Sequence, residues 1–65
     1  MNFSNDLSEL RRLAQQVDAQ IVSQLDVIER MKLTGFSTAE AEEALRFLRR
    51  CAAEVHRRLK LLTAA

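Results

Sequence analysis

The chain has 65 residues, of which 48% are hydrophobic and 29% charged, with one Gly and no Pro. This composition is typical of a single small helical domain, residues 1–65, and excludes a sheet or a disordered tail. The single Cys excludes an internal disulfide, and one Cys with one His makes no ligand set for a structural zinc. We therefore expect no metal, no cofactor, and a chain that needs a partner surface for stability.

The net charge of +1 hides an uneven distribution of charge along the chain. Residues 1 to 45 carry four basic and eight acidic side chains, whereas residues 46 to 65 carry six basic and one acidic. The first residues lack the basic start and apolar run of a secretory signal, and no run of about 18 apolar residues occurs. We expect a cytoplasmic protein with no membrane span.

The first apolar segment follows alternating steps of three and four residues, which is the heptad pattern of a helix that packs along one seam. Its seam positions are Leu7, Leu10, Ala14, Val17, Ile21, Gln24, Ile28 and Met31. Leu13 and Val27 widen the stripe on one flank and Leu25 widens it on the other, which favours more than one neighbouring helix. We predict a helix from about residue 5 to residue 33, roughly 40 Å long at ~1.5 Å per residue.

Gln24 is a polar interruption of this seam, and it has two interpretations. A polar seam residue can select the register or the number of partners, at some cost in stability. Alternatively, Leu25 takes the inward position and Gln24 turns to the boundary, and the sequence favours this second interpretation.

Residues 34–37 are expected to form the connection between two helices. Gly35 suits the left-handed residue that follows a helix C-terminus. Ser37 and Glu40 have the spacing of a capping box, in which each side chain accepts a backbone N–H at the start of a helix. The next helix is therefore predicted from about residue 38.

The second apolar segment repeats the pattern of the first, to about residue 62. Its seam positions are Ala41, Leu45, Leu48, Ala52, Val55, Leu59 and Leu62, with Ala44 and Cys51 on one flank. Two helices of similar length with a short connection favour antiparallel packing. The expected fold is all-α, an antiparallel two-helix hairpin, and a homodimer of hairpins would bury both stripes in a four-helix bundle.

The stretch Gln24-x-x-x-Ile28-x-x-Met31-x-x-x-Gly35-x-Ser37-Thr38-x-x-Ala41-x-x-x-Leu45 covers about a third of the chain. Its turn pattern, G-x-[DS]-T-x-x-A, resembles that of short uncharacterised bacterial proteins predicted to form helical hairpins, in which Asp often stands at the position of Ser37. The resemblance implies the hairpin and no activity. In architecture alone, the expected fold is similar to the plasmid RNA-modulator protein Rop, a dimer of helical hairpins.

Basic residues gather on the second helix and are the strongest functional lead. They are Arg46, Arg49, Arg50, Arg57, Arg58 and Lys60, spread over about 20 Å. Such a set can contact the phosphates of RNA or DNA in a salt-sensitive way, although the chain has no Trp or Tyr on which bases could stack. The alternatives are a solvated face that complements the helix dipole, or contact with an acidic protein or a membrane surface.

Catalytic residues are not expected. Cys51 and His56 are five residues apart, about 140° around a helix, so they do not converge. Cys51 fits a small apolar flank or an inter-subunit disulfide, and His56 fits an ordinary boundary residue or a pH-sensitive contact. Phe47 and Leu61 lie on one line away from the seam, as single exposed side chains or as a second contact surface.

The sequence thus predicts a non-enzymatic, self-associating hairpin that acts as an interaction or regulatory module. The alternative is a small dimeric nucleic-acid-binding protein that uses the basic residues. A partner protein encoded elsewhere is also compatible with the apolar stripes.

Overall fold

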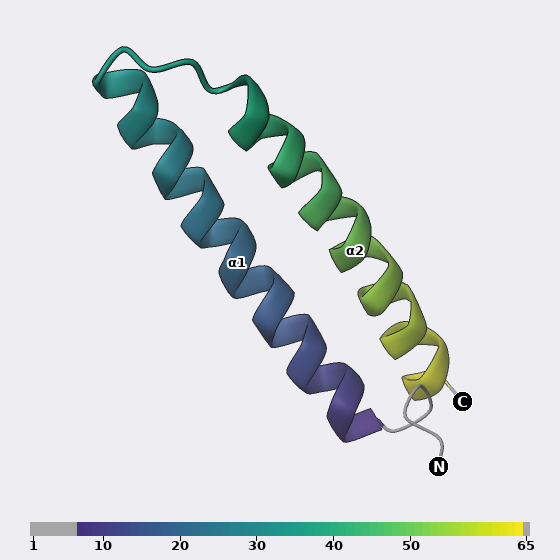
Figure 1. The fold of residues 1–65 in the computed structure, drawn as a ribbon. Helices are drawn as coiled ribbons and strands as arrows, with labels where there is room; N and C mark the ends of the chain where they lie inside the picture. The colour runs from purple at the N-terminus through teal and green to yellow at the C-terminus, as the bar shows by residue number, and fades with distance from the viewer. Residues whose placement is uncertain (1–6, 65) are drawn as a thin grey trace.

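The computed structural model describes residues 7–64 and contains two α-helices, α1 (Leu7–Leu33) and α2 (Ala39–Thr63). The two helices run side by side in opposite directions and are joined at one end by a short connection (Figure 1). The predicted all-helical hairpin is confirmed. The predicted start of the first helix, near residue 5, lies outside the described residues.

The end of α1 is a Schellman turn, in which backbone amides beyond the helix satisfy its last carbonyls. The Phe36 amide donates to the Met31 carbonyl at 2.9 Å, and the Gly35 amide donates to the Lys32 carbonyl at 3.2 Å. This pattern requires a left-handed residue, and Gly35 has a φ of 80° as predicted. The helix therefore ends at Leu33 because the chain reverses at Gly35.

Gly35→Ala is expected to lower the free energy of unfolding by about 1 kcal/mol, because a β-carbon disfavours the left-handed conformation. A β-carbon at this position would meet no atom within 4 Å, so the cost is confined to the backbone. Urea unfolding followed by circular dichroism measures the change, and Gly35→Asn is the control that should lose less stability. Equal stability of Gly35→Ala and the parent chain would contradict this role for the turn.

The start of α2 differs from the predicted capping box. The residue preceding the helix is Thr38, and its side chain makes no capping hydrogen bond, because its φ of −103° and ψ of 6° lie outside the extended region that a cap requires. The Thr38 hydroxyl instead donates to the Glu42 carboxylate at 2.5 Å. Ser37 accepts only a long bond, at 3.4 Å, from the Ala39 amide. Glu40 therefore lies in the first turn of α2 without the predicted pairing to a Ser37 cap.

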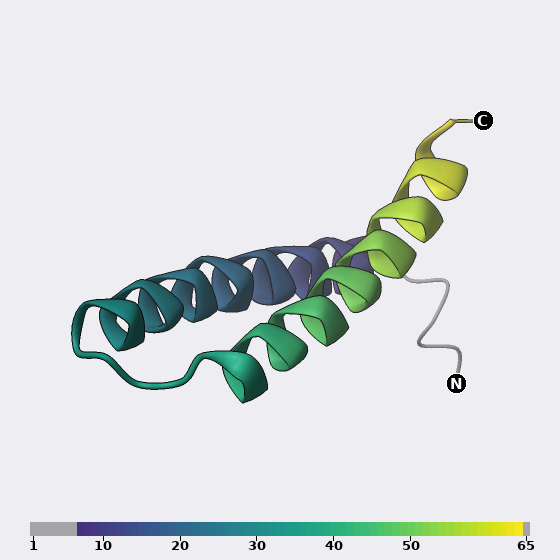
Figure 2. The same cartoon turned by 90° about the horizontal axis from the view of Figure 1, so that it is seen from above.

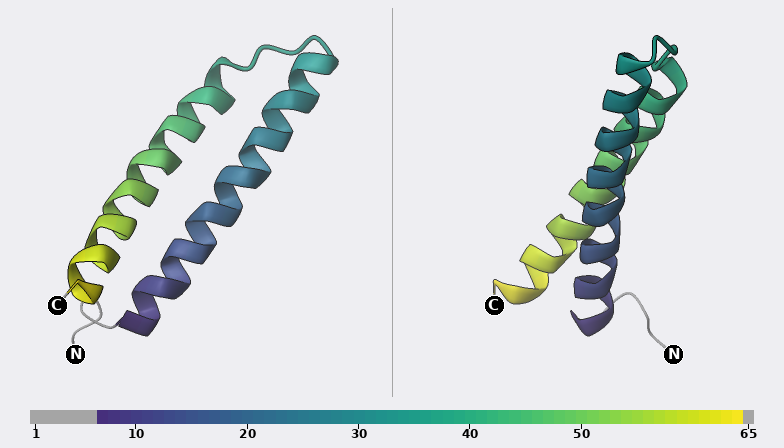
Figure 3. Two further views of the ribbon diagram at one scale, coloured as in Figure 1. Left: turned by 180° about the vertical axis from the view of Figure 1, so that it is seen from behind. Right: turned by 90° about the vertical axis from the view of Figure 1, so that its left-hand side faces the viewer.

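The contact between the helices buries only part of the predicted seam. Within residues 7–64, the buried apolar side chains are Leu10, Ala14, Ile28, Leu45 and Ala52. Apart from Leu62, the remaining apolar seam residues are half-buried. They are Leu7, Val17, Ile21, Met31, Ala41, Leu48, Val55 and Leu59. Leu62 is 42% exposed, against its prediction as a seam residue. The reason is that α2 crosses α1 and its last turns diverge from it (Figures 2 and 3).

Gln24 keeps the inward position, so the favoured sequence interpretation was wrong. Its side-chain amide donates to the Ala41 carbonyl on α2 at 3.0 Å and is half-buried. Leu25, which was expected to replace it, is exposed. A polar side chain at this depth is tolerated because it finds a hydrogen-bond partner across the seam.

Candidate functional site

The hairpin has two long sides that flank the seam, and their residues differ in character. Positions seven residues apart on a packed helix lie on one line, so each helix contributes one line of residues to each side. On one side these lines are Asp18, Leu25 and Lys32 from α1, with Glu42, Arg49 and His56 from α2. On the other side they are Leu13, Gln20 and Val27 from α1, with Ala44, Cys51 and Arg58 from α2.

The first side is called the polar face. Contacts between the two helices show that its charged residues lie together on that side. The Nε2 atom of His56 lies 3.0 Å from both carboxylate oxygens of Asp18, which joins the two helices across this side. Closer to the turn, Lys32, Glu42 and Arg49 line one shallow groove together with Leu25. The polar face thus places charged side chains from both helices next to each other in the open.

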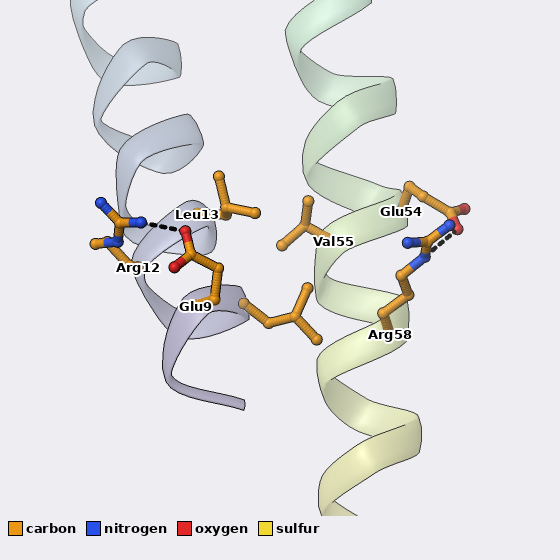
Figure 4. Close-up of a pocket in the computed structure, with 7 residues that line it drawn as sticks. Glu9, Arg12, Leu13, Glu54, Val55 and Arg58 are labelled. Carbon is orange, nitrogen blue, oxygen red and sulfur yellow. Dashed lines mark hydrogen bonds and ion pairs between the residues drawn. The ribbon is translucent and has the colours of Figure 1, made fainter. Parts of the chain in front are cut away.

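The opposite side is called here the groove face, and it holds an apolar groove of about 640 Å³ at the open end of the hairpin. Leu10, Leu13 and Val55 form its apolar lining. Leu13 and Val55 project from α1 and α2 into the space between the helices (Figure 4). The groove is therefore an unfilled part of the seam rather than a cleft for a polar ligand.

Two charged pairs border this groove and neutralise its rims. Glu9 pairs with Arg12 on α1, and Glu54 pairs with Arg58 on α2 at 3.1 Å (Figure 4). Glu54 also accepts a hydrogen bond from Arg57 at 2.7 Å. The bonds from Arg57 and then Arg58 hold the pKa of Glu54 below its ordinary value, so this carboxylate stays ionised beside its two guanidinium groups.

The groove face continues toward the turn with further exposed apolar side chains, and Gln20 lies between them on α1. Val27 lies fourteen residues after Leu13 on the same line of α1, and the two side chains are 44% and 40% exposed. Phe47 lies seven residues before Glu54 on α2, which places it on the same side, and it is 58% exposed. Several exposed apolar side chains on one side of a small protein, bordered by polar residues, are typical of a protein-interaction surface.

The six predicted basic residues are all exposed on α2, and they differ in whether they form ion pairs. Arg58 lies on the groove face and shares Glu54 with Arg57, while Arg46 lies 3.9 Å from Glu43. Arg49, Arg50 and Lys60 make no ion pair within residues 7–64. Half of the set is thus paired with acidic residues of α2 itself.

Cys51 and His56 are placed on opposite sides of the hairpin. Cys51 is a half-buried free thiol on the line of the groove face, whereas His56 is held by Asp18 on the polar face. In the part of the chain that the structure describes, no three His, Cys, Asp or Glu side chains gather as metal ligands. Neither described helix is long and apolar enough to cross a membrane.

Sequence reasoning missed the Asp18–His56 pair, although a signal was present. Asp18 follows the seam residue Ala14 by four positions, and His56 follows Ala52 by four positions. In an antiparallel pair of helices, such equivalent flank positions meet on the same side. Applying that rule would also have separated the polar face from the groove face.

Comparisons of this chain with protein-family models, curated proteins and solved structures found no match. The resemblance of the turn pattern to bacterial hairpin proteins thus stays a prediction.

Proposed function

We propose that this protein is a non-enzymatic, self-associating helical hairpin that acts as an interaction or regulatory module. Two copies close a four-helix bundle, and the outer surface of that bundle is available to other molecules. The observation that carries this proposal is the incomplete core. Only five of the described side chains are buried apolar groups, and two of those five, Ala14 and Ala52, are alanines.

Association supplies the stability that one hairpin lacks. A single core in a chain below about 70 residues rarely contributes more than ~3–5 kcal/mol, and small proteins usually add disulfides, metals or association. The single Cys makes no internal disulfide. Within residues 7–64, no side chain is less than 2% exposed. Burial of the half-buried seam residues by a second hairpin would complete the core at about 25 cal/mol per Å² of apolar area.

Molar mass in solution tests this proposal directly. Light scattering during size exclusion, over a dilution series, is expected to give the mass of two chains together with the circular dichroism of a helical protein. The dimer should persist at high salt, because apolar burial rather than exposed charge holds it together. A helical monomer at all concentrations would overturn the proposal.

A second candidate function, binding of RNA or DNA, is favoured by Arg49, Arg50 and Lys60, the cations of α2 that make no ion pair within residues 7–64. Arg49→Glu with Arg50→Glu should weaken nucleic-acid binding and reduce its salt dependence, because each phosphate contact releases counterions. Arg30→Glu is the control, since Arg30 lies on α1 and is already paired with Asp26 at 3.2 Å. Equal affinity of the parent chain and the double variant in a gel-shift assay would reject this function.

A further inference from the structure

We propose that the groove face is where the second copy docks, and that the copies are antiparallel across a two-fold axis near the middle of the hairpin. The apolar groove of each copy then receives Val27 and Phe47 of the other. This inference rests on the proposed self-association and adds the face and the direction of docking.

The choice of docking face follows from the polar and apolar side chains that each face exposes. On the polar face, His56 and Asp18 bond to each other, and burial of that pair with Lys32 and Arg49 would carry a desolvation cost. On the groove face, the two ion pairs beside the groove already neutralise each other. Leu13, Val27 and Phe47 expose apolar surface there, with Gln20 between Leu13 and Val27. Docking there covers apolar area and leaves the polar face in water.

The size of the groove face suits a stable dimer. It is two helices wide, about 20 Å, and α2 has 25 residues, so at ~1.5 Å per residue it extends over roughly 37 Å. These dimensions cover about 750 Å², close to the ~800 Å² that each partner buries in a standard interface. One hairpin of the same length covers this face completely.

The direction of docking follows from the distribution of residues along the face. The open end is hollow, with the groove lined by Leu10, Leu13 and Val55, whereas the turn end presents Val27 and Phe47. A parallel arrangement would place hollow against hollow and stack the ion-paired rims of both copies. An antiparallel arrangement places projecting side chains over hollows at both ends, because a two-fold axis repeats each contact.

The same arrangement places residues of α1 opposite suitable neighbours. Leu13 and Val27 are equally distant from Gln20, the midpoint of the 27-residue α1. A two-fold axis near that midpoint therefore brings Val27 of one copy to the groove between Leu10 and Leu13 of the other. On α2, it brings Phe47 of one copy toward Val55 of the other and the two Cys51 residues toward each other.

Thiol crosslinking tests the face. A short bis-maleimide applied at low protein concentration should join the two copies of the parent chain through Cys51, giving a covalent dimer on a denaturing gel. The double variant Arg49→Cys with Cys51→Ser carries its thiol on the polar face of the same stretch of α2. It should form no covalent dimer on the denaturing gel. The docking face would be wrong if light scattering reports a dimer and the Arg49→Cys chain crosslinks as well as, or better than, the parent chain. That outcome would leave self-association standing. Monomeric mass would overturn both.

Crosslinking between different variants tests the direction. In a Cys51→Ser background, a mixture of Leu13→Cys and Val27→Cys chains should form a mixed covalent dimer. The Leu13→Cys chain alone should form at least about tenfold less covalent dimer, since the two Leu13 positions lie at opposite ends of the antiparallel bundle. Efficient self-crosslinking of Leu13→Cys, with light scattering still reporting a dimer, would show parallel docking and overturn this part of the proposal.

Discussion

Val27→Glu is expected to dissociate the proposed dimer, whereas Val22→Glu is expected to leave it intact. Val27 is an exposed residue of the groove face, and docking of a second copy would bury a carboxylate there in each chain. An unpaired buried charge costs about 3 kcal/mol or more, which corresponds to more than 100-fold in Kd. The readout is molar mass by light scattering over a dilution series.

Val22 is the matched control for this substitution. It is a valine on the same helix, 67% exposed, and it belongs to neither line of residues that flanks the seam. Both variants add the same charge to α1, so a difference between them reports the position rather than the net charge. Equal dissociation by the two substitutions would contradict the assignment of the groove face as the interface.

Leu45→Ala is expected to lower the free energy of unfolding by about 2–5 kcal/mol, the cost of deleting a buried leucine side chain and leaving a cavity. Leu45 is one of the few buried large side chains, and it lies opposite Ile28 where the two helices are in contact. A loss of this size is a large part of the total stability of a small domain. Urea unfolding at a fixed protein concentration measures it, because dimerisation would make apparent stability depend on concentration.

Leu33→Ala serves as the comparison for the core substitution. Leu33 is 82% exposed at the end of α1 and belongs to neither line of residues that flanks the seam, so the same chemical change should alter stability by no more than about 0.5 kcal/mol. If both leucine substitutions cost the same, then Leu45 is not part of the core that joins the two helices, and the seam described above is wrong.

The two helices and the turn could be read from local patterns. Heptad spacing over residues 7–33 and 41–62 predicts two amphipathic helices because apolar burial repeats with the helical period. Gly35 identifies the reversal, since a left-handed residue is needed there and glycine adopts that conformation without strain. These features depend on neighbours within a few positions along the chain, which is why periodicity and residue type suffice for them.

Local patterns were less successful where two side chains competed for one role. Ser37 and Thr38 are both good capping residues, and the backbone angles of the connection place Thr38 before the helix without a side-chain cap. Gln24 and Leu25 compete for the inward position, and the Ala41 carbonyl on the other helix favours Gln24. In both cases the outcome depends on the path of the chain in space rather than on intrinsic preference.

The sequence by itself determined that this chain forms two apolar-striped helices joined at Gly35, because burial and backbone conformation act at short range. Only the tertiary structure decided how the two flanks of the seam differ, since each side combines residues from helices that are far apart in sequence. The relative shift of α1 and α2 sets His56 against Asp18 on the polar face and leaves Leu13 and Val55 around an open groove on the other. That shift follows from how the buried side chains of both helices fit together, including the small Ala14 and Ala52, and neither helix encodes it alone.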